Sequence, residues 1–446
     1  MSGGTQAPWG VSTVADVARL EMGQSPDGQA TNTKGKGIPL IGGAADYKEG
    51  RIEASRYTTE PTKVCCKGDL ILCIRATIGK VAVADKPYCL GRGVAGLRPS
   101  KVTADFLRYF LNSQANAMDE AGTGTTFRQI DKKTLSSWSI PLPEPKEQRR
   151  IVAKLDSLFK RSKSAREELT HIPRLVERYK EAILAAAFHG ELTVDWRQDH
   201  PHKATGKQLF AELVACRARH STKIAGRGAE ALDQPEGLQD LPHGWTWCPV
   251  AILASAVSDG VHKKPDYVER GIPFLTVRNL TAGPGITFDE CRYVTQSDHE
   301  EFIKRTHPER GDLLISKDGT LGVVRAIRTD VVFSIFVSVA LVKPVDRSMT
   351  DYLELAFTSP QVQQQMGGVG TGLQHIHLTD LRRDFVPIAP AEERAEIVKR
   401  VHSAFAYIER LETEPSRAAK LIDRLDQATL AKAFRGELLP QSARTV

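Results

Sequence analysis

The sequence predicts a mixed α+β fold in which two strand-rich domains, related by an internal repeat, are joined by two long antiparallel helices. The first observation behind this is that the segment from Gly122 to Leu192 recurs from Gly368 to Leu438, at a constant offset of 246 residues. The second is that most of the repeated segment has the apolar spacing of paired helices. The third is that the sequence before it consists of short apolar runs broken by Gly, Pro and Asp, which is typical of strands and turns.

The repeat is exact in length only in its helical part. GTGTTFRQI aligns with GVGTGLQHI, IPLPEPKEQRRIVAKLDSLF with VPIAPAEERAEIVKRVHSAF, and AILAAAFHGEL with ATLAKAFRGEL, all at the offset of 246. Upstream the offset slips, to 243 for KGDLILC and RGDLLIS, 245 for VAGLRP and VALVKP, and 234 for GIPLIGG and GIPFLTV. Each unit is therefore a domain that tolerates loop changes, followed by a segment of fixed length.

The segment of fixed length is predicted to be a helix of about 43 residues in each copy, roughly 65 Å long at 1.5 Å per residue. Apolar residues recur in steps of four and three, the 3.5-residue period of a coiled-coil seam. Pro173 and Pro415 are expected to kink or interrupt the helices, and Gly190 and Gly436 to end them. The predicted seam comprises Ile151, Leu155, Leu158, Leu169, Ile183, Ile397, Val401, Ile408, Leu411, Ile422 and Leu425.

The repeat predicts the following domain boundaries. Residues 1–143 and 244–389 form the two strand-rich domains, each followed by a long helix within 144–192 and 390–438. Residues 193–243 form a polar connector with one short helix near 208–219, and residues 439–446 form a tail. A two-fold relation between the units would make the helices antiparallel and bring the termini close together.

Composition narrows the class of protein. The net charge of +7 permits a nucleic-acid partner without proving one. Seven cysteines without a C-x-x-C pair indicate neither a zinc ribbon nor a redox dithiol, and reduced thiols indicate a cytoplasmic location. The longest apolar run, Val331–Val342, has 12 residues and is too short to span a bilayer, so no membrane partner is expected.

The motifs of several enzymes are missing. The chain has no P-loop, no Pro-Pro dipeptide of the kind that adenine methyltransferases use, and no Pro-Cys of cytosine methyltransferases. A string from Pro26-Asp27 to Asp46-Tyr47-Lys48 is similar to a metal-dependent nuclease pattern, but its spacing is loose. The sequence therefore predicts no catalytic residue and no metal ligand. Two alternatives stay open: a stand-alone nuclease or methyltransferase, and a duplicated helical adaptor without a DNA role.

The arrangement of motifs resembles the specificity subunit of type I restriction-modification systems. The resemblance rests on the I-P-L-P-x-P-x-E-Q-R entry to the first helix, on its A-A-F-H-G-E-L exit, and on the polar connector leading to L-P-x-G-W-x-W. In the second copy Glu393-Arg394 replaces Glu-Gln, a departure from the pattern at the start of the helix.

The resemblance implies a non-catalytic DNA reader. Two target-recognition domains would each read half of a split, asymmetric site in double-stranded DNA, and the helices would set the distance between the halves. Two modification subunits would supply the adenine methyltransferase with S-adenosylmethionine, and restriction subunits would supply translocation and cleavage with ATP and Mg. No cofactor is expected in this chain.

Residues for DNA contact are predicted from basic and amide side chains in loops that differ between the two copies. Such groups donate hydrogen bonds to base edges and phosphates, although each of them could equally be a solvated surface residue. The candidates are Lys34, Lys36, Arg75, Arg92, Arg128 and Gln129 in the first domain, and His262, Lys263, Lys264, Arg278, Asn279, Lys317, Gln374 and His375 in the second.

Overall fold

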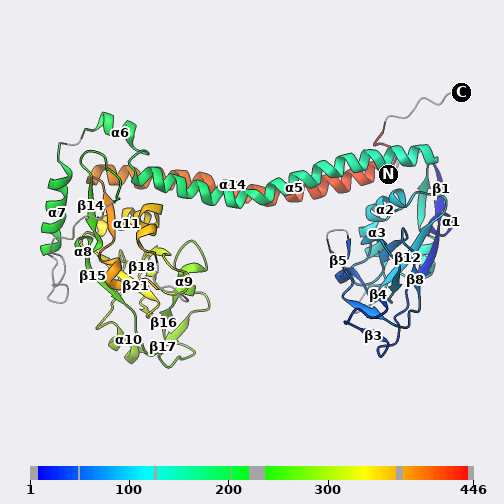
Figure 1. Cartoon of the computed structure of the whole chain (residues 1–446), viewed down its shortest axis with the longest axis horizontal. Coiled ribbons are helices and arrows are strands. Elements are labelled where there is room, and N and C mark those ends of the chain that lie inside the picture. Colours follow the sequence, from blue (N-terminus) through cyan, green and yellow to red (C-terminus); the bar gives the residue numbers. More distant parts are fainter. Residues whose placement is uncertain are drawn as a thin grey trace, which may run out of the picture. The chain divides into compact units, whose positions relative to one another are not determined.

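The chain forms two compact units that share two long helices (Figure 1). A computed structural model describes residues 9–48, 51–124, 128–201, 203–219, 237–367 and 375–439. Unit 1 comprises residues 1–171 and 414–446, and unit 2 comprises residues 172–413. Helix α5 (Pro145–Phe188) and helix α14 (Ala391–Phe434) each contribute one part to each unit. The predicted mixed fold with strand-rich domains and two long helices is confirmed.

Unit 1 contains, besides its parts of α5 and α14, short strands with a few helices. Its elements are β1 (Gly10–Thr13), α1 (Val14–Val17), β2 (Ala18–Met22), β3 (Thr31–Asn32), β4 (Ile38–Ile41), the 3-10 turn η1 (Ala44–Asp46), β5 (Tyr47–Lys48), β6 (Arg51–Ile52), β7 (Arg56–Thr58), β8 (Val64–Cys65), β9 (Leu70–Cys73), β10 (Val81–Val83), β11 (Tyr88–Leu90), β12 (Val94–Pro99), α2 (Ala104–Ser113), α3 (Ala115–Ala121), α4 (Lys132–Ser136) and β13 (Ser139–Leu142).

Unit 2 repeats this plan and adds two helices before its first strand. Its elements are α6 (Val194–Asp199), α7 (Gly206–Arg219), β14 (Thr246–Pro249), α8 (Val250–Leu253), β15 (Ala254–Asp259), β16 (Ile272–Leu275), α9 (Val277–Thr281), β17 (Arg292–Val294), α10 (Gln296–Phe302), β18 (Leu313–Ser316), β19 (Val324–Ala326), β20 (Ser334–Ile335), β21 (Val339–Pro344), the 3-10 turn η3 (Arg347–Met349), α11 (Thr350–Thr358), α12 (Pro360–Gln365), α13 (Leu378–Leu381) and β22 (Phe385–Ile388). Helix α7 is the short helix predicted within the connector.

The two units share the central part of their sheet topology, although the second sheet has five strands in unit 1 and three in unit 2. A four-stranded sheet has the order β10-β9-β12-β2 in unit 1 and β19-β18-β21-β15 in unit 2. A second sheet contains the order β7-β4-β11 in unit 1 and β17-β16-β20 in unit 2, with β4 parallel to β11 and β16 parallel to β20. The first and last strands of each globular part pair as β1-β13 and as β14-β22. The repeat seen in the sequence is thus a repeat of topology.

Each unit anchors both long helices in its main core. In unit 1, Phe434 near the end of α14 packs edge-on against Phe106 and Phe110 of α2, with ring centroids 5.3 and 5.4 Å apart. In unit 2, Phe188 at the end of α5 packs against Tyr352 of α11 at 5.3 Å. Phe188 and Phe434 are repeat equivalents, 246 positions apart. Because an insertion would pull one of these rings out of its core, the fixed length of the repeated segment has a structural cause.

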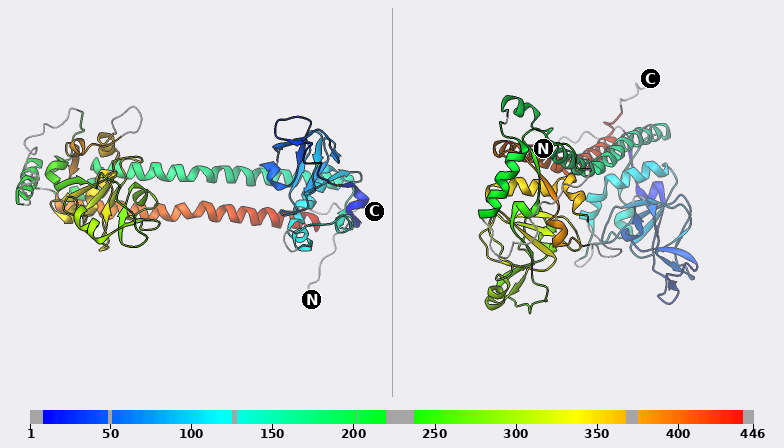
Figure 2. Two further views of the ribbon diagram at one scale, coloured as in Figure 1. Left: turned by 90° about the horizontal axis from the view of Figure 1, so that it is seen from below. Right: turned by 60° about the vertical axis from the view of Figure 1, so that its left-hand side comes forward.

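The helices pack with a seam that differs from the predicted one toward their C-terminal ends. Figures 1 and 2 show α5 and α14 side by side, and in each unit their contacts run antiparallel. The seam prediction is wrong for two residues, Leu411 and Leu425, which are 41% and 61% exposed. Of the other predicted residues, Ile151, Leu155, Ile397, Val401 and Ile408 are buried, while Leu158, Leu169, Ile183 and Ile422 are half-buried.

The cause of the difference is helical periodicity. A straight helix has 3.6 residues per turn, so a strict 3.5-residue pattern drifts around it by about 20° per heptad. Toward the ends of the helices the buried residues are Leu184 and Ala187 in α5 and Leu430 and Ala433 in α14, one position after the 3.5-residue pattern and within the domain cores. The same drift occurs in both copies of the repeat.

The helix ends agree with the sequence, but the predicted interruptions do not occur. Gly190 and Gly436 have φ of +75° and +78°, the left-handed conformation that ends a helix. Pro173 and Pro415 lie inside helices that are continuous over 44 residues each. Each proline removes one backbone donor, and the helical hydrogen bonds on either side of it are sufficient to carry the helix through.

One buried carboxyl group makes the stability of unit 2 depend on pH. Asp384, between α13 and β22, is 8% exposed, and its Oδ2 has no hydrogen-bond partner among the described residues. Burial, helped by the charge of Asp380, raises the pKa of Asp384 to about 7. The neutral carboxyl therefore stabilises the fold fully below the ordinary pKa of 3.8, and this stabilisation is lost as the pH rises through about 7.

Replacing Asp384 with Asn should raise the melting temperature of unit 2 at pH 8 by several degrees and at pH 5 by clearly less, because the amide remains neutral at both values. Scanning calorimetry at the two pH values measures this. Asp330→Asn, at a side chain that is 83% exposed, is the matched control. An equal shift for Asp384→Asn at pH 5 and pH 8 would show that this carboxyl is not neutral in the folded protein.

Candidate nucleic-acid interface

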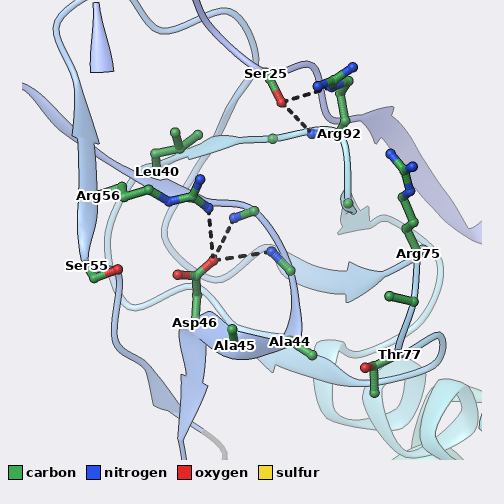
Figure 3. Close-up of a pocket in the computed structure, with 15 residues that line it drawn as sticks. Ser25, Leu40, Ala44, Ala45, Asp46, Ser55, Arg56, Arg75, Thr77 and Arg92 are labelled. Carbon is green, nitrogen blue, oxygen red and sulfur yellow. Dashed lines mark hydrogen bonds and ion pairs between the residues drawn. The ribbon is translucent and has the colours of Figure 1, made fainter. Parts of the chain in front are cut away.

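Unit 1 has a concave pocket of about 720 Å³ at one edge of its second sheet (Figure 3). Its walls come from the end of β4, the turn η1, the start of β7, the loop after β9 and the turn between β11 and β12. The lining residues are Ser25, Leu40, Gly42, Gly43, Ala44, Ala45, Asp46, Ser55, Arg56, Arg75, Ala76, Thr77, Gly91, Arg92 and Gly93. Most of these are small, so backbone forms much of the wall.

Glycine is required where two of these turns meet. A Cβ atom on Gly93 would lie 2.1 Å from the carbonyl oxygen of Gly42, and a Cβ on Gly42 would lie 2.3 Å from Nη2 of Arg56. Without side chains at these two positions, the turn after β11 packs directly on the turn after β4, and the Arg56 guanidinium lies close above the backbone. Gly93 is therefore required by the close packing of the two turns, whereas a side chain at position 42 would meet only the movable end of Arg56.

Asp46 anchors the floor of the pocket. It is 5% exposed, and its Oδ2 accepts hydrogen bonds from the backbone N–H groups of Gly42 at 2.7 Å and Gly43 at 3.2 Å. Oδ2 also lies 4.0 Å from Nη2 of Arg56. Asp27, the other acid of the nuclease-like string, accepts a hydrogen bond from the N–H of Gln29. Both carboxylates thus have local structural roles, and among the described residues no group of three or more potential metal ligands is found.

Three arginines surround the opening of this pocket. Arg92 donates from its backbone N–H and from Nε to Oγ of Ser25, each at 3.3 Å. Arg75 lies in the loop after β9 and forms a β-bridge with Gln129. Figure 3 shows Arg56 on the side opposite to Arg75 and Arg92. A guanidinium on each side of a cavity walled by backbone can bind an anionic or polar edge that enters between them.

Unit 2 has a pocket of about 540 Å³ with a different, aromatic lining. The guanidinium of Arg292 lies over the ring of Tyr267 at 4.5 Å, and Nζ of Lys264 lies 5.9 Å from the same ring. Phe274 packs against both Tyr267 and Phe336, with centroids 5.9 and 6.1 Å away. The lining residues are Lys264, Tyr267, Phe274, Thr276, Val277, Arg278, Asn279, Glu290, Arg292, Asp318, Gly319, Phe336 and Ser338.

The two pockets occupy the same place in the two units. Strands β4 and β16 carry the matching runs Ile38-Pro39-Leu40 and Ile272-Pro273-Phe274. Leu40 pairs with Arg56 across the sheet, and Phe274 pairs with Arg292, so the two arginines are equivalent by strand register.

Elsewhere the equivalent positions differ in chemistry. The loop after β9 presents Arg75, bridged to Gln129, where the loop after β18 presents Asp318, bridged to His375. Gly91 and Gly93 of unit 1 align with Phe336 and Ser338 of unit 2. One scaffold therefore holds two pockets that share one arginine and differ in most other lining groups.

The structure places five of the predicted contact residues at these pockets: Arg75, Arg92, Lys264, Arg278 and Asn279. Asn279 and Arg278 have polar partners in neighbouring turns, as Arg92 has in Ser25. The Oδ1 atom of Asn279 accepts from the N–H of Thr276 at 2.9 Å and caps α9, and Arg278 pairs with Glu290. Because Asn279 is 5% exposed, its amide belongs to the turn rather than to a ligand surface.

The remaining candidates lie outside the two pocket linings. Lys34 and Lys36 donate their backbone N–H groups to Oδ1 of Asn32 in an exposed turn. Arg128 is exposed and pairs with Asp119. Gln129, His262, Lys263 and His375 are exposed as well, and Gln374 lies outside the described residues.

Lys317 is part of a buried charge cluster instead of an exposed surface. Its side chain is 13% exposed and lies 3.6 Å from carboxylate oxygens of both Asp259 and Asp318. Asp259, itself 4% exposed, also accepts from Arg305 at 2.7 Å and faces His262 at 3.3 Å. Lys317 therefore neutralises the buried Asp259 and the half-buried Asp318, and its ammonium is poorly placed to reach a base edge.

Sequence reasoning missed Arg56, Arg292 and Tyr267. The offset between Arg56 and Arg292 is 236, whereas the runs that begin at Gly37 and Gly271 differ by 234, so the loops between β4 and β7 and between β16 and β17 have different lengths. No sequence match marks the arginines as a pair. Only the register of β7 on β4 and of β17 on β16 does so.

The fold and the pockets together define a duplicated recognition module. One topology occurs twice on a shared pair of helices, and each copy has a different pocket at the equivalent position. Among the described residues, no helix is long and apolar enough to cross a membrane.

Comparison with known proteins agrees with this class. Residues 6–174 match the family described as type I restriction modification DNA specificity domain. The EcoBI specificity subunit of Escherichia coli is 26% identical over 97% of this chain and 87% of its own length. The EcoKI specificity subunit of Escherichia coli K12 is 25% identical over 97% of this chain and 90% of its own length.

Two solved structures share the fold. A chain from work on complex assembly and conformational transition of the type I R-M system superposes with a TM-score of 0.57, at 19% identity, over 97% of this chain and 99% of that one. The HsdS subunit of Thermoanaerobacter tengcongensis superposes with a TM-score of 0.52, at 19% identity, over 98% of this chain and 99% of that one.

Over nearly its whole length the chain is similar to type I restriction-modification specificity subunits, and residues 6–174 match the DNA specificity domain. The predicted resemblance is confirmed, since the matching proteins are specificity subunits of type I restriction enzymes.

Proposed function

We propose that this specificity subunit reads a bipartite, asymmetric site in double-stranded DNA, with residues 1–143 as one target-recognition domain and 244–389 as the other. The observation that carries this proposal is the pair of equivalent pockets with unlike linings. Because the two pockets lie at equivalent positions, both would contact DNA. Because their lining residues differ, the two half-sites would differ in sequence.

Arg56 and Arg292 are the residues best placed to contact bases. Arginine donates two hydrogen bonds to O6 and N7 of guanine, the commonest specific contact in the major groove. Beside Arg56 the walls are backbone and small side chains, which leaves room for a base edge. Beside Arg292 the rings of Tyr267 and Phe336 offer apolar contact, for example to a thymine methyl group.

Replacing Arg56 or Arg292 with Ala should weaken binding of the cognate duplex by about 1–3 kcal/mol and relax specificity at one half-site only. Affinities for cognate and scrambled duplexes, at two salt concentrations, and the methylated motif of the assembled complex measure this. Arg→Lys at each position keeps the charge but loses the fork of donors, so it should restore non-specific binding without restoring specificity.

Arg417→Ala, at a side chain on α14 that is 71% exposed, is the matched control and should bind as the unchanged protein does. If both pocket variants lose cognate and scrambled duplex equally, the two arginines contact phosphate alone. If neither variant changes binding or the methylated motif, the pockets are not the readers.

The partners we propose are two modification subunits, with restriction subunits recruited to the same complex; S-adenosylmethionine, ATP and Mg would be bound there. In support, the repeat presents one apolar pair twice: Leu175 and Tyr179 on α5 are 51% and 66% exposed, and their equivalents Leu421 and Leu425 on α14 are both 61% exposed. Two equivalent exposed patches fit two copies of one partner. Such a complex would act in the cytoplasm.

We also propose that the helices within 144–192 and 390–438 act as the spacer between half-sites, with 193–243 as a connector and 439–446 as a tail. Support comes from the fixed offset of 246 and from the aromatic anchors at the helix ends. A continuous helix resists changes in length, so the gap between half-sites would be constant.

Inserting one heptad into both helices, in α5 between Arg166 and Lys180 and in α14 between Glu412 and Asp426, tests the spacer. These sites keep the anchors and the interhelical ion pairs on either side intact. Each helix grows by about 10 Å, so the gap should grow by at most about three base pairs at roughly 3.4 Å each. Both half-sites should survive, with lower affinity, because the added base pairs rotate one half around the duplex axis.

The methylated motif of the altered complex is the measurement, and insertion of a heptad into α5 alone is the control that should prevent assembly. A complex that assembles and still modifies the original gap would show that the helices do not set it.

A further inference from the structure

Two interhelical ion-pair sites connect α5 with α14, one in each unit. In unit 1, Nη2 of Arg166 lies 2.7 Å from Oδ2 of Asp426 and 2.8 Å from Oδ1 of Asp423, and Oγ of Ser162 donates to Asp426 at 2.7 Å. In unit 2, Nζ of Lys180 lies 2.6 Å from Oε1 of Glu412. Lys180 also lies 3.5 Å from Glu177 on its own helix.

The two ion-pair sites occupy equivalent positions of the internal repeat. The offset of 246 relates Arg166 to Glu412 and Lys180 to Asp426. The same two helix positions therefore face each other in both units, but their charges are not repeated. Helix α5 carries a cation at both positions, and α14 carries a carboxylate at both.

Exchanging partners would remove this complementarity. If two copies of α14 paired in the same register, Glu412 would face Asp426 with Asp423 beside it, and no cation of α5 would be present. Two copies of α5 would bring Arg166 opposite Lys180, with Glu177 between them to moderate the repulsion. Any exchange between two chains that produces the α5 pair also leaves two α14 helices for each other, so the cost of three facing carboxylates is unavoidable.

Apolar packing alone would not prevent this exchange. The buried positions at the start of the two helices match in character, with Ile151 and Leu155 of α5 equivalent to Ile397 and Val401 of α14. These residues lie in the domain cores of the two units, so they do not distinguish α5 from α14, and in coiled coils flanking charges can decide pairing and orientation.

We propose that the charges at these two sites make α14 select α5 as its partner and reject a second copy of itself. The side chains are partly shielded, with Asp426 18%, Lys180 26% and Arg166 37% exposed, so their interaction is screened less than that of fully exposed ions. On the proposed function, exclusive pairing of α5 with α14 keeps both unlike pockets in one molecule. Pairing of two copies of the same helix would instead bring together two identical pockets, which would read a symmetric DNA site.

Charge variants of the full-length chain test the proposal without DNA. Arg166→Glu with Lys180→Glu gives α5 the charges of α14, and Glu412→Arg with Asp426→Lys gives α14 the charges of α5. The four changes together exchange the charges and restore opposite signs at both sites. Thermal unfolding, followed by circular dichroism at low and at high salt, compares the three variants with the unchanged protein.

The double acidic variant should melt about 2–5 °C lower at low salt, and the difference should shrink at high salt. The double basic variant should lose less, because Glu177 and Asp423 remain beside its cations. The fourfold variant should melt close to the unchanged protein. If the fourfold variant is no more stable than the double acidic one, the charges do not select the partner and the proposal is wrong.

Binding of cognate duplex by each variant that folds separates this proposal from the proposed function. Restored stability together with lost DNA binding in the fourfold variant would leave helix selection standing and count against the DNA role. If all variants bound DNA normally and did not differ in melting temperature, helix selection would be wrong and the DNA role would stand.

Discussion

The docking of each long helix into a domain core at both of its ends is the constraint on which the rest of the structure depends. Ile151 and Leu155 fix the start of α5 in the core of unit 1, and Phe188 fixes its end against Tyr352 in unit 2. Helix α14 is held in the same way, in the reverse direction, by Val401 in unit 2 and Phe434 in unit 1. Since the rings at the helix ends fill closely packed cores, one inserted residue would rotate a ring by about 100° out of its site. The fixed offset of the repeat is therefore a packing requirement, and the freedom of the loops elsewhere follows from their exposure.

This constraint explains which features could be read from the sequence. Helix length, the terminal glycines and the duplicated topology all follow from periodicity and from the repeat, which act over many residues and so average out local exceptions. Of the two effects expected of Pro173 and Pro415, interruption does not occur, because α5 and α14 continue through them over 44 residues. The seam was misplaced at Leu425 because a pattern of 3.5 residues per turn, extended over a straight helix of 3.6 residues per turn, falls progressively behind the packing face.

The pockets were much harder to predict, and the reason is strand register. Arg75 and Arg92 could be chosen from their loops, but Arg56 and Arg292 become a pair only when β7 is placed on β4 and β17 on β16. Charge alone also selected a residue that has internal partners. Lys317 resembles any loop lysine in sequence, but it lies between the carboxylates of Asp259 and Asp318. A single sequence does not reveal which cations have internal partners, because those partners come from distant elements such as β15, which contributes Asp259 to that cluster.

Duplication of one domain provides two candidate binding surfaces, and it also allows equivalent helices of two chains to pair with each other. Two copies of one domain on one pair of helices present two different pockets, which on the proposed function are two reading surfaces, but two similar halves can also pair with the wrong partner. Apolar packing cannot separate right from wrong here, since it is the part of the structure that the repeat preserves best. Divergence must then lie in groups that tolerate change, and these are the ones that differ: the pocket linings, where Arg75 is replaced by Asp318, and the helix surfaces, where Arg166 is replaced by Glu412. On this argument the asymmetry of the pockets and the asymmetry of the helix charges answer one requirement, because a reader of unlike half-sites functions only if its two unlike halves remain together.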